Sequence, residues 1–138
     1  MIDPLAGAAP AVVLIVEDEC LLRELAAELV EDAGFVALQA ADAEAAIAVL
    51  VARSDVAAIF TDINLPGRID GLELAHTVRD RWPPIRILIA SGRVRPKPSE
   101  LPSNSVFLEK PYRGAAVIAH LHFLTDPAEA LIGSDILP

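Results

Sequence analysis

Residues 57–71 read AAIFTDINLPGRIDG, where an apolar run ends on an acid, Asp62, and breaks at once on Asn64, Pro66 and Gly67. An apolar run followed directly by turn-forming residues is typical of a buried strand that ends in a tight loop. A carboxylate is unfavourable to bury unless a cation or hydrogen bonds compensate its charge. The stretch therefore predicts a strand with an acid at its end, and raises the question of what faces that acid.

Four other short apolar runs lie at residues 12–16, 35–40, 85–90 and 105–109. Because these runs do not alternate with polar residues, they predict strands that are covered on both faces. Segments with helical spacing separate them. Strands that alternate with helices in this way predict an α/β fold, in which right-handed crossovers wrap a parallel sheet on both faces.

The predicted helices have identifiable ends in capping residues, glycine and proline. They run from Cys20 to the C′ glycine Gly34, from the cap Asp42 through Ala52, from about Gly71 to Arg81, and from Tyr112 to Leu124. The first helix is amphipathic. Its apolar stripe consists of Leu21, Leu22, Leu25, Ala26, Leu29 and Val30.

The connection between the fourth and fifth predicted strands is different. Residues 94–104 read VRPKPSELPSN, with three prolines close together, so we expect any helix there to be short or irregular. We interpret residues 1–10 as an N-terminal tail and residues 125–138 as a C-terminal tail, with one helical turn at residues 128–131. The sequence predicts no output domain beyond the single domain of residues 11–124.

The amino-acid composition limits the classes of function that this chain can have. With 54% hydrophobic residues and a mean hydropathy of +0.46, the 138-residue chain can fill one core. The chain has a formal net charge of −9, whereas nucleic-acid-binding proteins carry clusters of basic residues. This charge instead suits a basic partner or a metal ion. The single cysteine excludes an internal disulfide, and neither a secretory signal nor a membrane span is evident. We therefore expect a cytoplasmic domain.

Polar residues collect where the predicted strands end: Glu17 and Asp18 after the first, Asp62 at the third, Ser91 after the fourth and Lys110 after the fifth. Ligands of open α/β sheets bind at the carboxyl ends of the strands, where the strand order reverses. In the order 2-1-3-4-5, the three acids meet at that point. Carboxylates that close need a cation, and oxygen ligands suit Mg²⁺. The pattern indicates a site for a phosphoryl group and its metal.

These motifs resemble the receiver domain of the two-component response regulator family. The similarity covers about residues 11–124 and rests on VLIVEDE, FTDINLPGRIDG, ILIASG and VFLEKPY. It implies a flavodoxin-like, doubly wound sheet of five parallel strands in the order 2-1-3-4-5. It also implies a role in bacterial two-component signalling, and because no sequence remains for an effector domain we expect a stand-alone response regulator.

The resemblance implies that Asp62 accepts a phosphoryl group. Asp18, Asp62 and the backbone carbonyl of Asn64 would hold Mg²⁺, for which Mn²⁺ can substitute, while Glu17 would act through water. Lys110 would neutralise charge on the phosphoryl group. An ionised carboxylate flanked by these cations needs no additional acid or base.

Two further features are implied by the resemblance. Ser91 and Phe107 would form a switch pair, in which the Ser91 hydroxyl binds a phosphoryl oxygen and the Phe107 ring enters the space that this movement frees. The Lys110–Pro111 peptide bond would be cis. The chain would catalyse only its own phosphorylation and dephosphorylation.

The implied partners are a sensor histidine kinase or a histidine phosphotransfer protein, and an unidentified downstream protein. Neither nucleic acid nor membrane is expected as a partner. A phosphorylation-dependent dimer is compatible with the resemblance, but residues 94–104 depart from the family pattern, so its geometry does not carry over. Glu17 stands where Asp is commoner, and Asp70-Gly71 comes one residue later than usual.

Two alternatives stay open at this point. A phosphohydrolase of the haloacid dehalogenase type also uses a strand-end Asp with Mg²⁺, although its second acid, two residues later, is here Asn64. A receiver-like scaffold would bind partners without being phosphorylated. Glu17, Asp18, Ser91 and Lys110 argue against the scaffold, because it needs none of them.

Overall fold

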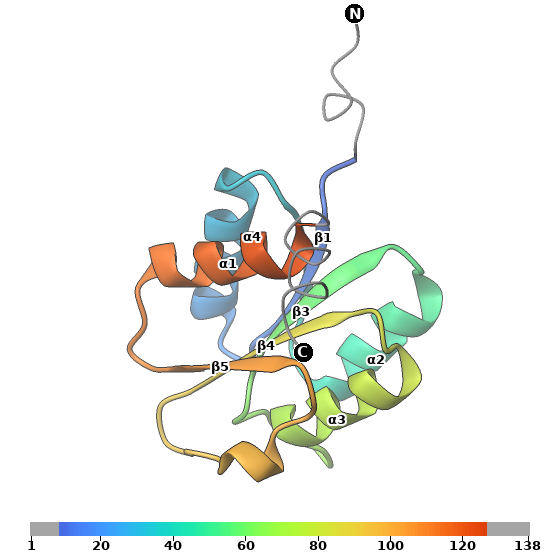
Figure 1. Ribbon diagram of the computed structural model, residues 1–138, viewed down its shortest axis with the longest axis vertical. Coiled ribbons are helices and arrows are strands. Elements are labelled where there is room, and N and C mark those ends of the chain that lie inside the picture. Colours follow the sequence, from blue (N-terminus) through green and yellow to red (C-terminus); the bar gives the residue numbers. More distant parts are fainter. Residues whose placement is uncertain (1–8, 127–138) are drawn as a thin grey trace, which may run out of the picture.

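A computed structural model describes residues 9–126 as a five-stranded parallel sheet with helices on both faces (Figure 1). The strand order is β2-β1-β3-β4-β5, as predicted. The strands are β1 (Val12–Val16), β2 (Val36–Ala40), β3 (Val56–Asp62), β4 (Arg86–Ser91) and β5 (Ser105–Glu109). The helices are α1 (Cys20–Asp32), α2 (Ala43–Ala52), α3 (Gly71–Arg81) and α4 (Gly114–Thr125), with one 3₁₀ turn, η1 (Pro98–Glu100). The helical turn expected at residues 128–131 lies outside the described residues.

The sheet separates two apolar layers. Helices α1 and α4 cover one face and α2 and α3 the other (Figure 1). Successive residues of a strand point to opposite faces, so Val13 and Ile15 pack with α1 and α4, whereas Leu14 and Val16 pack with α2 and α3. All five residues of β1 are buried. The prediction of strands covered on both faces is confirmed for β1, β3 and β4, and is wrong for β2 and β5, which are partly exposed because they lie at the edges of the sheet.

Local capping explains where two of the helices begin. The Asp42 carboxylate accepts a hydrogen bond from the Ala45 N–H at 2.7 Å, and the Asp70 carboxylate accepts one from the Glu73 N–H at 2.9 Å. The last helix begins at Gly114, two residues later than predicted, because Arg113 has extended backbone angles and serves as its N-cap.

The apolar stripe of α1 is only partly buried. Leu21, Leu22 and Leu25 are 71%, 43% and 53% exposed, and the buried residues of this helix are Ala27 and Val30. Periodicity indicates which side chains share a helix face, but a neighbouring element must also be present to cover them. Here the N-terminal half of the stripe is left uncovered beside a cavity described below.

The connection between β4 and β5 contains one 3₁₀ turn in place of a helix, which confirms the prediction for this segment. Side chains of α3 hold it. The Arg79 guanidinium donates hydrogen bonds to the carbonyls of Ser103 (2.8 Å) and Asn104 (3.2 Å). The same guanidinium bonds the carbonyls of Pro83 and Ile85, and His76 Nε2 lies 2.6 Å from the Glu100 carbonyl oxygen. Proline has no backbone N–H, so this segment has fewer backbone donors for its carbonyl groups. The side chains of Arg79 and His76 bond carbonyls that backbone N–H groups would bond in a helix.

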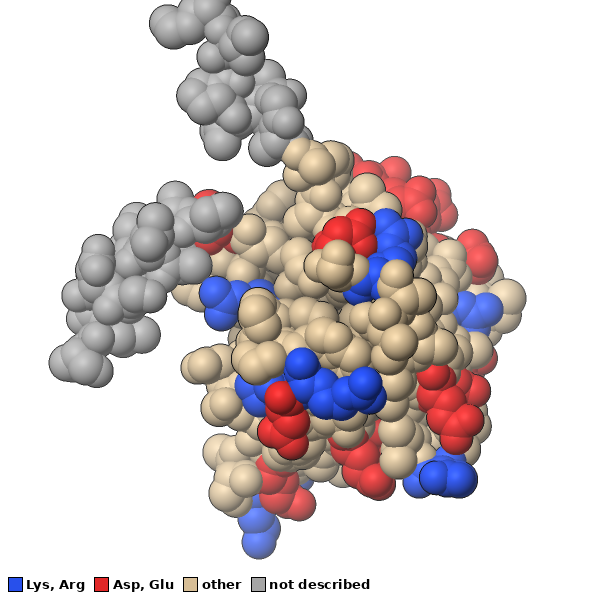
Figure 2. Space-filling view, turned by 90° about the vertical axis from the view of Figure 1, so that its right-hand side faces the viewer, with Lys and Arg blue, Asp and Glu red and all other residues tan. Residues whose placement is uncertain are grey.

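Acidic and basic side chains stand beside one another over the face shown in Figure 2. That face carries no broad patch of a single sign, although the chain as a whole has a formal net charge of −9. Among the described residues, no helix combines the length and the hydropathy needed to cross a bilayer.

Candidate functional site

Three carboxylates meet at the carboxyl edge of the sheet. Strands β1 and β3 are neighbours, so Glu17 and Asp18, which follow β1, lie beside Asp62, the last residue of β3. One carboxylate oxygen from each lies within 4.8 Å of the other two. Glu17 is buried and Asp62 half-buried, whereas Asp18 is exposed. Asp18 lies one residue further past the strand end, at the opening of the site.

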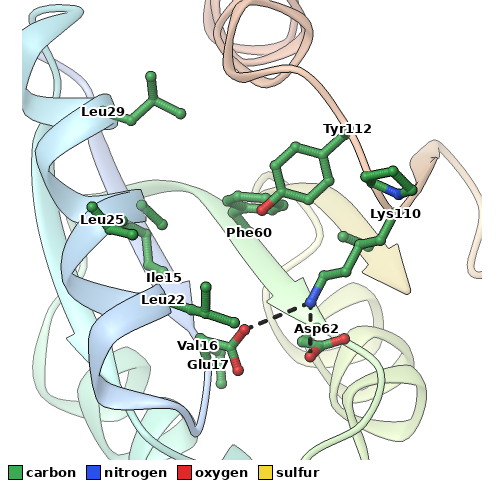
Figure 3. A pocket seen from close by; sticks show the side chains of 13 residues that line it. Ile15, Val16, Glu17, Leu22, Leu25, Leu29, Phe60, Asp62, Lys110 and Tyr112 are labelled. Atoms are coloured by element: carbon green, nitrogen blue, oxygen red, sulfur yellow. Dashed lines mark hydrogen bonds and ion pairs between the residues drawn. The ribbon is translucent and has the colours of Figure 1, made fainter. Parts of the chain in front are cut away.

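Lys110 is the cation nearest these acids. Its Nζ lies 3.2 Å from Asp62 Oδ2 and 3.6 Å from Glu17 Oε1 (Figure 3). The Lys110 N–H donates to the Ser91 carbonyl at 2.9 Å, which continues the pairing of β5 with β4 and sets the position of the lysine. Although burial favours the neutral amine, the carboxylates of Asp62 and Glu17 raise the pKa of Lys110. The side chain is therefore an ammonium at neutral pH.

Glu17 is held by both its side chain and its backbone. Its Oε2 accepts a hydrogen bond from the Glu19 N–H at 3.3 Å, and its carbonyl accepts one from the Arg23 guanidinium at 3.0 Å. Burial is the main cause that raises the pKa of Glu17, and the neighbouring Asp18 and Asp62 act in the same direction. The site thus holds more negative charge than Lys110 alone balances. The anchoring role of Arg23 was not predicted from the sequence.

One oxygen of Asp62 has no hydrogen-bond partner within the part of the chain that the structure describes. Oδ2 accepts from Lys110, whereas Oδ1 is buried and has no hydrogen bond among the described residues. Buried polar atoms normally have a hydrogen-bond partner. A hard divalent cation binds carboxylate and carbonyl oxygens as ligands. The unsatisfied oxygen and the excess of carboxylates fit Mg²⁺. No other group of three metal-binding side chains occurs in the described part of the chain.

A cavity of about 320 Å³ opens directly over the acids. Its lining residues are Glu17, Asp18, Glu19, Leu22, Asp62, Asn64, Gly92, Arg93 and Lys110. The structure therefore brings Asn64 to the predicted site. It also brings Gly92 and Arg93 there, which the sequence analysis did not single out, although their position directly after Ser91 could have indicated them.

Ser91 and Phe107 occupy neighbouring strands. Ser91 ends β4 and is fully buried, and its Oγ accepts a hydrogen bond from the Val94 N–H at 3.1 Å. Phe107 lies on β5 opposite Ile89, is half-buried and packs against the α2 and α3 side of the core. The Lys110–Pro111 peptide bond is cis, as expected.

A second, more apolar cavity of about 480 Å³ adjoins the first (Figure 3). Leu22, Leu25 and Leu29 of α1 form one side, and Phe60 and Tyr112 line the other, with their ring centroids 5.8 Å apart. The two cavities share Glu17, Leu22, Asp62 and Lys110. The exposed leucines of α1 thus lead to the acidic site.

Comparison with known proteins identifies the family. The model of the response regulator receiver domain matches residues 13–121, so the chain belongs to this family. The response regulator protein FleR of Pseudomonas aeruginosa is 32% identical over 111 residues, which are 78% of this chain and 23% of FleR. The nitrogen assimilation regulatory protein NtrX of Azorhizobium caulinodans is 41% identical over 81 residues, 58% of this chain and 18% of NtrX. The chain thus spans about a fifth of the length of these curated relatives.

Solved structures agree with this assignment. A response regulator receiver protein from Sinorhizobium medicae shares 26% identity at a TM-score of 0.80, over 86% of this chain and 96% of that one. The receiver domain of the hybrid histidine kinase CckA shares 26% identity at a TM-score of 0.72, over 84% of this chain and all of that one (100%). The recognition of a receiver domain, the predicted fold and the assignment to bacterial two-component signalling are confirmed.

Proposed function

We propose that Asp62 accepts a phosphoryl group from a phosphohistidine of a sensor histidine kinase or a histidine phosphotransfer protein. The observation that carries this proposal is the state of the Asp62 carboxylate: an ammonium lies 3.2 Å from one oxygen, and the other oxygen has no hydrogen-bond partner among residues 9–126. A carboxylate oxygen attacks phosphorus, and the phosphorus–nitrogen bond of the donor breaks with its electron pair on nitrogen, so a donor ring already protonated on its other nitrogen leaves as neutral imidazole. No acid or base of this chain is needed for that step.

Asp18, Asp62 and the backbone carbonyl of Asn64 would hold Mg²⁺, or Mn²⁺ in its place, with Glu17 acting through water. When bound, the ion supplies positive charge to the oxygens of the transferred group. Because Asp18 is exposed and only a few protein oxygens are available, we expect weak binding in the unphosphorylated protein.

Lys110 and Ser91 would bind oxygens of the phosphoryl group once it is attached to Asp62. The Lys110 ammonium already lies beside Asp62 and can move onto a phosphoryl oxygen. The Ser91 Oγ accepts from the Val94 N–H, which leaves its own hydrogen to donate to another phosphoryl oxygen. In the proposed switch, Ser91 moves toward the phosphoryl group to donate this hydrogen bond. The movement frees space for the Phe107 ring and changes the conformation of residues 91–113.

Signalling would proceed by protein contact. A differential affinity of about 1–3 kcal/mol between the two states would change partner occupancy severalfold. Hydrogen exchange with and without beryllofluoride should therefore change at residues 91–113 as well as in the metal loops. Changes confined to the metal loops would mean that the proposed switch does not transmit.

The apolar cavity beside α1 is the proposed docking surface for the phosphohistidine donor, since in this family the corresponding helix contributes to kinase docking. Leu22 and Leu25 are exposed next to Asp62. A donor that places its histidine at Asp62 therefore meets these leucines, and their burial would contribute to binding.

Labelling by a small donor tests the assignment. Intact-protein mass after incubation with acetyl phosphate and Mg²⁺ should show one added phosphoryl group on the native chain and none on Asp62→Asn. Asp80→Asn removes an exposed acid from α3 and should label normally. Equal labelling of native chain and Asp62→Asn would contradict the assignment, absence of labelling would favour the scaffold, and turnover of a phosphomonoester would favour the phosphohydrolase.

A further inference from the structure

We propose that Arg93 is a second cationic ligand of the phosphoryl group on Asp62, and that it prolongs the phosphorylated state by covering that group. This inference rests on the proposed function and extends it to a residue outside the predicted site. It concerns a specific arginine of this chain and the lifetime of its signal.

The turn after β4 places Arg93 at the acidic cavity. The hydrogen bond from the Val94 N–H to Ser91 Oγ (3.1 Å) closes this turn. Gly92 packs so closely on Lys110 that a β-carbon at position 92 would lie 3.3 Å from the lysine Cβ. Arg93 thus follows a glycine held against Lys110 and lines the same cavity as Asp62.

Arg93 differs from the other basic residues of this segment. Arg95 is paired with the Glu109 carboxylate, and neither Arg95 nor Lys97 lines the cavity. Arg93 is exposed and, within residues 9–126, forms no ion pair. Its guanidinium is therefore available to a new anion at the site.

The charges at the site call for one more cation after phosphorylation. Glu17, Asp18 and Asp62 supply three negative charges, and Lys110 with a divalent cation would supply three positive ones. A phosphorylated side chain carries about −1.5 to −2 charge at pH 7, so phosphorylation of Asp62 adds roughly one negative charge. One guanidinium restores the balance, and its planar fork suits two phosphoryl oxygens.

The position of Arg93 also bears on hydrolysis. Water that hydrolyses the aspartyl phosphate must approach phosphorus from the side opposite the Asp62 oxygen, through the open cavity. A guanidinium bound across the phosphoryl oxygens at the cavity wall occupies part of that approach. Removal of Arg93 should therefore weaken binding of the phosphoryl group and speed its loss.

The test uses the full chain and two measurements. Amide chemical shifts report the affinity for beryllofluoride in the presence of Mg²⁺, and intact-protein mass reports the half-life of the phosphorylated chain after acetyl phosphate is removed. We expect Arg93→Gln to weaken beryllofluoride binding by about tenfold, the equivalent of one charge-assisted hydrogen bond. The half-life of the phosphorylated Arg93→Gln variant should be roughly three- to tenfold shorter than that of the native chain.

Matched variants sharpen the test. Arg93→Lys keeps the charge without the fork and should lie between native and Arg93→Gln. Arg95→Gln removes a neighbouring arginine that does not line the cavity and should leave both measurements unchanged. Both positions tested, 93 and 95, are exposed side chains of one loop, so the three variants should fold.

The outcomes separate this inference from the proposed function. If the native chain is labelled on Asp62 but Arg93→Gln matches it in both measurements, the inference is wrong and the proposed function stands. A longer half-life in Arg93→Gln would equally overturn it, because Arg93 would then assist hydrolysis. If the native chain takes no phosphoryl group, both proposals fail.

Discussion

Gly71 packs directly against the backbone of Asp62. A β-carbon on Gly71 would lie 2.7 Å from the Asp62 carbonyl carbon and 2.8 Å from the Ile63 Cα. The Gly71 N–H donates to the Ile63 carbonyl at 2.8 Å, and Asp70 caps the helix that begins here. The first turn of α3 is thus seated on the residue that carries the proposed phosphoryl site.

The substitution Gly71→Ala should therefore disturb both folding and the site. We expect the free energy of unfolding to fall by about 3 kcal/mol, because both the helix and the strand end resist movement. Denaturant unfolding measures this loss, and labelling of Asp62 should slow in parallel. The control is Gly114→Ala, whose β-carbon would meet only the flexible Leu29 side chain, at 3.1 Å. An equal loss in both variants would contradict the proposed close packing at Asp62.

Arg79 should be essential for the β4–β5 connection. Its guanidinium bonds four backbone carbonyls, and loss of several such bonds should lower the free energy of unfolding by about 2–4 kcal/mol in Arg79→Ala. Hydrogen exchange should accelerate across residues 97–104. Arg79→Lys cannot reproduce the fork and should recover only part of the loss. Native-like exchange in Arg79→Ala would show that the prolines alone hold the segment.

Leu25→Asp should separate docking from chemistry. Leu25 is 53% exposed, so the fold should tolerate the change, but a charge beside the apolar cavity should weaken binding of a protein donor. We expect phosphotransfer from a cognate phosphohistidine protein to fall by about tenfold or more, the equivalent of 1.4 kcal/mol, with acetyl phosphate labelling unchanged. Val51→Asp places the same charge on α2, at a residue 64% exposed, and should not affect transfer. Equal transfer by both variants would place docking elsewhere.

Lys110→Met should affect the metal and the reaction in opposite directions. The methionine retains apolar bulk, while removal of the ammonium frees Asp62 Oδ2 and leaves the carboxylates with more uncompensated charge. Mg²⁺ should bind several-fold more tightly, as measured by amide shifts near Asp18 and Asp62. Phosphorylation by acetyl phosphate should slow by about 100-fold or more, the typical loss when one charge-stabilising donor is removed. Weaker Mg²⁺ binding would mean that Lys110 organises the site instead of competing with the ion.

Much of this molecule can be predicted from the sequence because the signals are local. Asp42 and Asp70 cap helices through contacts three residues away, and the prolines of residues 94–104 exclude a regular helix through their own backbone. The apolar runs predict both ends of each strand to within one residue. The meeting of Glu17, Asp18 and Asp62 needed one further premise, the strand order, which came from the resemblance to receiver domains.

Tertiary structure decided which of these residues are covered and what else reaches the site. The leucines of α1 form a stripe in the sequence, but the packing of separate elements decides that Leu22 and Leu25 are exposed beside a cavity. Arg79 bonds carbonyls 24 and 25 residues away, and Arg93 lines a cavity with Asp62, 31 positions earlier in the chain. Such contacts depend on how separate elements pack, a property that spacing along the chain does not encode.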